Sequence, residues 1–551
     1  MNNLTNLTEE ILLEKARAER PKLPDFEAMW ERIRAEQALA GAQAVFNSGK
    51  SSRKLVSKRL LLPAVAVSVL LVAAPVVAGV SMGWTELFGR LGVKTAMESG
   101  FGNPLDITVQ TAGTSLSLHG VVTDEQRLDI LFTLEVPSLP DYDAVEFQHK
   151  TLTSAKGKSM QLNELIRKDL SSNQLTGLFE TENGLGNKRE QLKLALQNLS
   201  FFKYKDVPLR EAPASLKENN QVDSMSKFGA LRIVSVLREN DVFTIRYEIP
   251  VTSEDQLLDP RLFLKSGDKT IKVGYSAVLP PEKANVRLRQ DTFRLSDEEL
   301  KNASLHFSFL EAIRTIEGTW ETSFEADGKK ASQATFRKKL ESALEDPILF
   351  KKPKELIVTP LQIRVMLENY KNSPDQPYAY YDKAELLLNG RTIEGGLWGT
   401  EKSGSFYRFE SPEWYKDWSP VPMTLQLSEA RIVKRANDRW FPLEAVSESK
   451  QTSKTILDGF PVTLTYYQQD QDLIVESQSD DSKFLGISQT AVKLDGKAIY
   501  PQPNPMPPGG NGSNKRTDLY PGLLAKKGTL QLSPGFYSYS DPERKSIIPI
   551  N

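Results

Sequence analysis

Residues 115–136 read SLSLHGVVTDEQRLDILFTLEV, and this stretch decides the fold. Every second residue from Leu128 to Val136 is apolar, so these side chains point to one face of an extended chain. The polar residues 123–126 separate this run from an alternating run that begins at Ser115. Alternation on both sides of a short polar segment is typical of a β-hairpin. We therefore predict an antiparallel hairpin with one buried face.

The same alternation returns three times further along the chain, in residues 231–249, 361–367 and 462–475. The starts of the four stretches lie about one immunoglobulin-like domain apart, since such a domain has about 100 residues. A supersecondary pattern that recurs at this spacing indicates repeated domains. We therefore expect a mainly β chain with about four extracytoplasmic immunoglobulin-like β-sandwich domains in series.

A short cytoplasmic α-helical segment and one transmembrane helix are expected before these β domains. The expected ranges are 1–59 for the cytoplasmic helical segment, 60–84 for the transmembrane helix, 85–100 for a juxtamembrane segment, 101–222 for a membrane-proximal β-sandwich domain, 223–348 for an immunoglobulin-like domain, 349–452 for an aromatic-rich β domain and 453–551 for a C-terminal β domain.

The transmembrane prediction rests on residues 60–84, LLLPAVAVSVLLVAAPVVAGVSMGW, which contain no charged side chain. A helix of about 25 residues reaches about 37 Å, which exceeds the ~30 Å hydrocarbon core of a bilayer. A buried helix of a soluble protein would rarely stay apolar over this length. We expect this segment to contact membrane lipid.

Basic residues before the apolar run predict the orientation of the chain. Residues 50–59 contain five Lys and Arg side chains and no acidic residue, whereas the charges after Trp84 balance. Because basic residues stay on the cytoplasmic side, the N-terminus is expected inside and the β domains outside. The long segment before the run favours an uncleaved single-pass anchor in the cell membrane over a secretory signal peptide.

The cytoplasmic segment contains an apolar stripe at helical spacing. Its members are Phe26, Met29, Trp30 and Ile33. Two short helices bury little surface by themselves, so the stripe needs a partner or stays partly exposed. One interpretation is a weakly folded tail that packs on itself, and the other is a docking face for a cytoplasmic partner.

Composition and motifs point away from an enzyme. The chain has no cysteine and only three histidines, and the histidine spacing fits no metal site, so we expect no metal and no cofactor. No nucleophile or phosphate-loop motif is present. A formal net charge of −1 gives no basic face for nucleic acid. The acidic pairs Asp124–Glu125, Asp470–Asp472 and Asp480–Asp481 fall in predicted turns, where we expect solvated side chains.

The densest aromatic region lies between residues 378 and 418. Its members are Tyr378, Tyr380, Tyr381, Trp398, Tyr407, Trp414, Tyr415 and Trp418. Such residues fill the core or rim of a sandwich, or they form a platform for a carbohydrate or protein ligand outside the cell.

The segment VVTDEQRLDILFTL, together with the preceding membrane helix and cytoplasmic segment, resembles a family of single-pass membrane proteins of the Bacillota. In that family, a membrane-proximal domain of unknown function is followed by further immunoglobulin-like domains. The resemblance covers mainly residues 60–140 and implies an anti-sigma-factor-like role, in which the inner segment holds a sigma factor and the outer domains sense an envelope signal. The His/Cys/Cys zinc motif of many anti-sigma factors is absent here, because neither residue type occurs before residue 60.

Two functions of different classes follow from these patterns. The first is a membrane regulator of the anti-sigma type, with Phe26, Met29, Trp30 and Ile33 as the contact face. The second is a cell-surface binding or structural protein, whose inner segment only flanks the anchor.

Overall fold

The computed structural model describes residues 89–551, apart from short gaps. The gaps are 169–173, 240, 253–254, 256–257, 280, 282, 341–345, 369–375, 401–402, 437 and 503–513. The predicted cytoplasmic segment, the predicted membrane helix 60–84 and the predicted partner-binding residues Phe26, Met29, Trp30 and Ile33 lie outside the described residues. Within the described residues, no helix is both long and apolar enough to cross a membrane.

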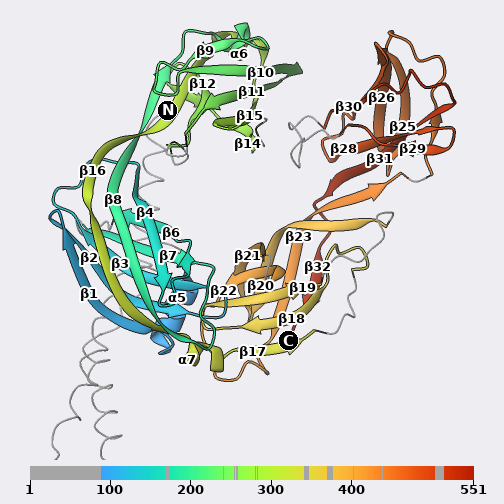
Figure 1. Ribbon diagram of the computed structural model, residues 1–551. Helices are drawn as coiled ribbons and strands as arrows, with labels where there is room; N and C mark the ends of the chain where they lie inside the picture. The colour runs from blue at the N-terminus through green and yellow to red at the C-terminus, as the bar shows by residue number, and fades with distance from the viewer. Residues whose placement is uncertain are drawn as a thin grey trace, which may run out of the picture. The chain divides into compact units, whose positions relative to one another are not determined.

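The described part of the chain is mainly β, as the sequence predicts, and consists of several antiparallel sheets (Figure 1). Its helical segments include α5 (Leu91–Glu98), η1 (Pro213–Ser215), α6 (Asp297–Asn302) and α7 (Lys329–Gln333). Four large hydrophobic cores divide these strands into four groups, which we call modules A to D.

Module A surrounds the first core, with one sheet of order β1–β2–β3–β7–β6 and a second that includes β5, β4, β8 and β16. Its strands are β1 (Asn103–Thr111), β2 (Thr114–Thr123), β3 (Leu128–Glu135), β4 (Ala144–Ser154), β5 (Ser159–Met160), β6 (Asn163–Lys168), β7 (Gln174–Thr181), β8 (Arg189–Pro208) and β16 (Ser304–Asp327). Strands β2 and β3 form the predicted hairpin, and its alternate apolar side chains are buried.

Module B surrounds the second core, with a sheet of order β14–β15–β11–β10–β9 facing β12 and β13. Its strands are β9 (Gln221–Asp223), β10 (Ala230–Glu239), β11 (Val242–Pro250), β12 (Arg261–Ser266), β13 (Lys269–Ile271), β14 (Val273–Leu279) and β15 (Val286–Arg294). The hairpin expected in residues 231–249 is the β10–β11 pair.

Modules A and B share the two longest strands, β8 and β16, which run side by side through both (Figure 1). In β16, Phe307 and Phe309 belong to the core of module B, whereas Trp320 and Phe324 belong to that of module A. Module B is therefore an insertion between β8 and β16. The expected ranges 101–222 and 223–348 place two domains one after the other. The cores differ from this order, because β16, which lies in the second range, contributes to both.

Modules C and D surround the third and fourth cores and share a 12-stranded sheet. The strands of module C are β17 (Phe336–Lys339), β18 (Pro353–Val358), β19 (Gln362–Leu367), β20 (Tyr378–Leu388), β21 (Arg391–Thr400), β22 (Gly404–Glu410), β23 (Met423–Arg435), part of β31 (Leu530–Asp541) and β32 (Ser546–Pro549). Those of module D are β24 (Phe441–Pro442), β25 (Gln451–Leu457), β26 (Phe460–Gln469), β27 (Asp472–Gln478), β28 (Phe484–Leu494), β29 (Lys497–Ile499), β30 (Arg516–Tyr520) and the remainder of β31.

Module D is inserted into module C between β23 and β31, just as module B is inserted into module A. Strand β31 pairs with β23 through one part and with β28 through most of its length. Ile548 and Ile550, at the end of the chain, return to the core of module C. The cores again differ from the expected ranges 349–452 and 453–551, because residues near the end of the second range complete the core of module C.

The strand pairing of modules A and B is repeated in modules C and D. The order β1–β2–β3–β7–β6 corresponds to β17–β18–β19–β22–β21, and the pairs of β8 with β4 and β16 correspond to those of β23 with β20 and β31. In the insertions, the β12–β13 pair beside β16 corresponds to the β28–β29 pair beside β31. The β domains are thus two copies of one nested unit, called repeat 1 (modules A and B) and repeat 2 (modules C and D).

Candidate functional site

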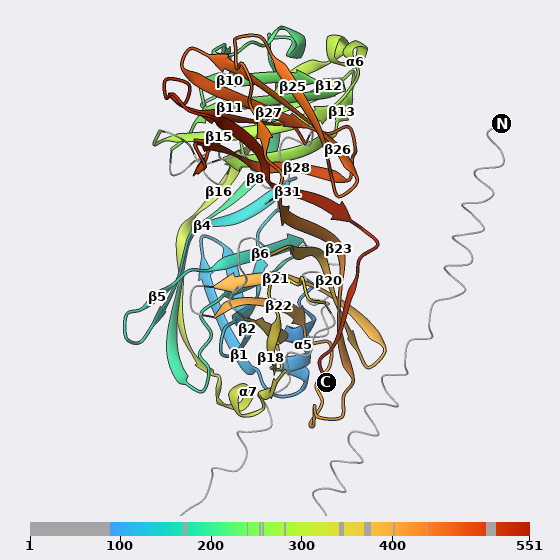
Figure 2. The same cartoon turned by 90° about the vertical axis from the view of Figure 1, so that its right-hand side faces the viewer.

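Helix α5 is the first described element of the chain, and it lies beside β22 in both views (Figure 1, Figure 2). Its buried face contains Gly92, Val93, Thr95, Ala96 and Met97. The helix has eight residues and no side-chain cap at its N-terminus. Because a helix this short is marginal in water, its stability comes from the surfaces that it packs against.

These surfaces belong to both repeats. Val93, Ala96 and Met97 pack on an apolar patch of repeat 1, formed by Val122, Leu131 and Leu178, and the same cluster includes Leu361 of repeat 2. Phe101, just after the helix, makes an edge-to-face contact with Trp414 of repeat 2, with ring centroids 5.1 Å apart. The helix therefore fills the contact between the repeats, which we call the joint.

A glycine allows the helix to approach repeat 2 closely. A Cβ atom at Gly92 would lie 1.7 Å from the carbonyl oxygen of Leu361 and 2.9 Å from Oε2 of Glu410. The Gly92 N–H donates to Oε2 of Glu410 at 3.1 Å, and Oγ1 of Thr95 donates to the Ser411 carbonyl at 2.8 Å. A larger residue at position 92 would separate the helix from repeat 2.

Glu410, at the end of β22, also binds a buried arginine of repeat 1. Both terminal nitrogens of Arg127 donate to its carboxylate, at 2.5 and 3.1 Å, and the side chain of Arg127 is 1% exposed. Nε of Arg127 donates to Oδ2 of Asp129 at 2.8 Å. Bidentate pairs of this kind are strong and directional. A single carboxylate thus connects helix α5, the β2–β3 turn and strand β22.

The turn of the β2–β3 hairpin contacts the equivalent turn of repeat 2. Oδ2 of Asp124 accepts hydrogen bonds from Oγ1 of Thr359 at 2.7 Å and from Nε2 of Gln362 at 2.9 Å. Burial alone would raise the pKa of Asp124, but the charge of Arg364 and the backbone N–H donors of its own turn outweigh burial and lower it. Asp124 is therefore ionised and fully buried, and the expectation of a solvated side chain is wrong for this residue because repeat 2 covers the turn.

Asp129 is the unusual acid of the joint. It is buried, and its Oδ1 atom has no hydrogen-bond partner within the described residues. Burial, with the negative charges of Glu180 and Glu410, raises the pKa of Asp129 to about 7. The positive charges of Arg127 and Arg90 oppose this shift. Glu180 in turn accepts from Nε of Arg90 at 2.8 Å. The joint thus contains an acid that titrates near neutral pH.

Further ion pairs surround the joint at its rim. Glu125 pairs with Arg337 at 2.5 Å and with Arg364 at 3.8 Å, and Glu182 lies 3.9 Å from Arg408. These partners come from different repeats. Partly exposed pairs of this kind contribute little free energy each, so they set the alignment of the two surfaces more than the strength of the joint.

The aromatic region predicted from the sequence lies mainly in and around the core of module C. Tyr381, Tyr407 and Trp418 are buried there, and Trp414 and Tyr415 pack against that core. Trp398 is 40% exposed, and the guanidinium carbon of Arg408 lies 3.5 Å from its ring centroid. The region therefore serves packing at most positions, with Trp398 at the surface.

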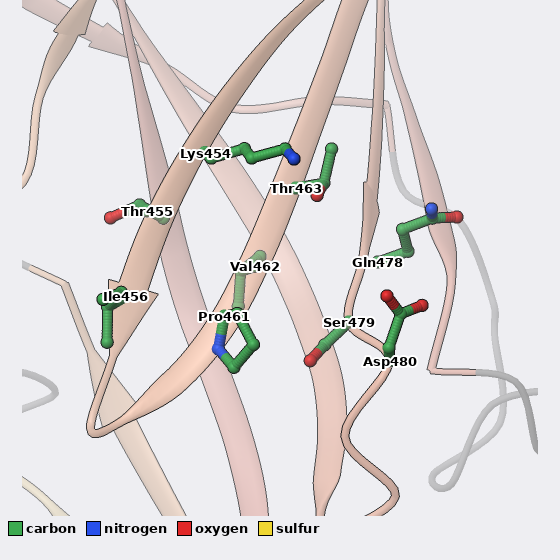
Figure 3. Close-up of a pocket in the computed structure, with 9 residues that line it drawn as sticks. All are labelled: Lys454, Thr455, Ile456, Pro461, Val462, Thr463, Gln478, Ser479 and Asp480. Atoms are coloured by element: carbon green, nitrogen blue, oxygen red, sulfur yellow. The ribbon is translucent and has the colours of Figure 1, made fainter.

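A separate open groove of about 420 Å³ lies on module D (Figure 3). Polar side chains from three neighbouring strands line it, among them Lys454, Thr463 and Gln478, with Ile456 and Pro461 as apolar neighbours. Asp480, predicted as a turn residue, is at its edge. The groove is wide and shallow, and its residues make no closed constellation of acid, base and nucleophile.

Sequence reasoning did not find Gly92, Glu410, Thr359 or Gln362, because these residues meet only when the repeats pack together. One signal was available in strand β3. Ile130, Leu131 and Phe132 are consecutive and apolar, so both faces of the strand carry apolar side chains. A strand that is apolar on both faces is covered on both.

Comparisons with known proteins show no family for this chain. No family model and no curated protein matches it. Among solved structures, it is similar to a conserved domain protein from Bacillus anthracis at 11% identity, covering 41% of this chain and 91% of that chain, with a TM-score of 0.16. It is also similar to a Paenibacillus xanthan lyase at 8% identity, covering 82% of this chain and 55% of the lyase, with a TM-score of 0.10. Similarity at these TM-scores carries no argument about fold or function.

Proposed function

We propose that this protein is a single-pass membrane regulator of the anti-sigma type, with four immunoglobulin-like outer modules and an inner segment that binds a sigma factor. The observation that carries the proposal is the position of helix α5. It follows the apolar residues 60–84 closely in sequence, and both repeats contact it. A change in the outer modules that moves α5 would act on the chain next to the membrane.

The inner contact face in this proposal is the stripe of Phe26, Met29, Trp30 and Ile33. Aromatic and branched apolar anchors at the centre of an interface dominate its binding free energy. The stripe therefore supplies the sigma-factor contact, and the outer modules supply the signal.

The test is a pull-down of sigma factors from the source organism by the full-length protein in detergent. Wild type retains one sigma factor, and the double variant Trp30→Ala, Ile33→Ala loses it, because loss of central anchors costs about 2–4 kcal/mol or more of binding free energy. The matched control is Phe46→Ala, an aromatic residue outside the stripe, which retains the sigma factor. Absence of any sigma factor from the wild-type sample contradicts the proposal.

A cell-surface binding protein is the second candidate, and the groove on module D is the observation that favours it. Lys454 and Asp480 place opposite charges in one groove between polar Thr463 and Gln478, which suits a polar ligand outside the cell. Binding of purified cell wall by wild type, lost in Lys454→Ala with Asp480→Ala, would support this candidate. Unchanged wall binding by the double variant would remove it.

A further inference from the structure

Both repeats hold helix α5 by apolar and polar contacts. On the side of repeat 1, the helix packs on three apolar residues, Val122, Leu131 and Leu178, and Nε of Arg90, its N-cap residue, donates to Glu180 at 2.8 Å. On the side of repeat 2, it has Leu361 and two hydrogen bonds, made by Gly92 and Thr95. Hydrogen bonds depend on distance and direction, so a small separation of the two repeats breaks those that join α5 to repeat 2. Because α5 is followed directly along the chain by β1 of repeat 1, separation of the repeats removes the contacts that the helix makes with repeat 2.

Glu410 concentrates the contacts of repeat 2 in one side chain. Its carboxylate accepts from the Gly92 N–H and from two nitrogens of Arg127. Arg127 is held in turn by Asp129, and Glu180 and Arg90 complete the charged group around it. Loss of the charge at position 410 therefore weakens the hold on α5 and on the β2–β3 turn together.

Repeat 2 contains the counterpart of the patch that binds α5. The backbone pairs Asp124–Arg127 and Thr359–Gln362 close equivalent turns, and the strand registers then align Val122, Leu131 and Leu178 with Ile357, Met366 and Phe406. These three residues form a small buried cluster of their own.

Among the residues that the structure describes, no helix equivalent to α5 belongs to the cluster of Ile357, Met366 and Phe406. The guanidinium of Arg364 lies 6.0 Å from the ring centroid of Phe406, and α7, the helix before β17, has five residues. The sheet architecture of a repeat is therefore complete without an eight-residue helix, and α5 is an addition at the joint.

We propose that the joint is a latch. Glu410 and Leu361 hold helix α5 against repeat 2, and separation of the two repeats releases the helix from repeat 2. This inference deepens the proposed function, and it rests on that function only for what the release of α5 does to the inner segment. The latch itself belongs to the outer modules and is measured without a sigma factor.

The test is hydrogen–deuterium exchange on the full-length protein in detergent, followed by mass spectrometry of peptides that cover residues 91–98. Glu410→Gln keeps the shape of the side chain and removes its charge. Gly92→Ala adds one methyl group against the Leu361 carbonyl. In both variants, amides of α5 exchange roughly 10- to 100-fold faster than in wild type, as expected from loss of a hydrogen bond to a charged group.

Gly396→Ala is the matched control, because a Cβ atom there meets nothing closer than Nε1 of Trp398 at 3.6 Å. It leaves exchange in α5 unchanged. Strands β10, β11, β26 and β27 of the inserted modules keep their wild-type protection in all three variants.

Two results overturn the latch. Wild-type exchange of α5 in both Glu410→Gln and Gly92→Ala shows that the helix is not held by these contacts. Faster exchange throughout modules A to D shows that the joint supports the whole fold and does not open by itself. Either result leaves sigma-factor binding by the inner segment standing, since that is read by the pull-down.

Discussion

At the scale of single residues, Arg127 of the joint is grouped with three carboxylates. Arg127 contacts Asp129 and Glu410 directly, and Glu180 lies close enough to raise the pKa of Asp129. Removing one partner of a buried ion pair is strongly destabilising, because the other charge remains buried. Protonation of Asp129 does not leave Arg127 unpaired, because Glu410 still binds it, and it removes one of the three negative charges of the group.

The pKa of Asp129 makes the joint sensitive to pH. If opening of the joint lets water reach Asp129, its pKa returns toward the ordinary value of about 3.9. Because the closed joint raises the pKa to about 7, protonation favours the closed state. The stabilisation is complete below about pH 4 and is lost as pH rises through about 7.

We predict that exchange of the α5 amides, corrected for the intrinsic effect of pH, becomes faster in wild type between pH 5 and pH 8. Asp129→Asn cannot ionise, so its corrected exchange stays level over the same range. The measurement is hydrogen–deuterium exchange of residues 91–98 at four pH values. A slope in Asp129→Asn equal to that of wild type would show that another group is responsible.

At the scale of elements, the two long strands β8 and β16 decide how module A is completed. Trp320 of β16 is buried in the core of module A, where it packs edge-to-face against Phe147 with ring centroids 5.5 Å apart. Its Nε1 donates to the Thr114 carbonyl of β2 at 3.2 Å. Trp320 lies after the whole of module B in the sequence, and it nevertheless belongs to the core of module A, whose first strands precede module B.

Trp320→Ala tests this connection. Truncation of a buried tryptophan costs about 3–5 kcal/mol of unfolding free energy. We predict faster exchange in β2 and β3 of module A, whereas β10 and β11 of module B keep their protection. Ile313→Ala, at a 43% exposed position of the same strand, is the matched control and changes neither. Loss of protection mainly in module B would contradict the insertion.

The sequence predicts the elements well and their connections poorly. The four stretches with alternating apolar residues are strands β2–β3, β10–β11, β19 and β26–β27, because the two-residue period depends only on which face is buried. Strands β8 and β16 also alternate, but no local signal shows that one end of such a strand serves one core and the other end serves another. The burial of Asp124 depends on Thr359 and Gln362, which are distant in sequence.

At the scale of the whole molecule, the described part of the chain contains two nested units of similar strand order, and the joint between them contains the helix that follows the predicted membrane segment. The second copy buries the counterpart of the α5 patch without a helix. The first copy uses that patch to hold α5. This difference between the copies is the reason that movement of the repeats would act on α5 and on the chain before it.

The measurement that tests this account most directly is sigma-factor binding by the full-length protein in lipid nanodiscs, compared among wild type, Glu410→Gln, Gly92→Ala and Gly396→Ala. If release of α5 regulates the inner segment, the first two variants shift the dissociation constant in the same direction, by roughly 5- to 150-fold for a typical coupling free energy. Gly396→Ala binds as wild type does. Equal affinity in all four proteins, with α5 released in the first two, would contradict the account.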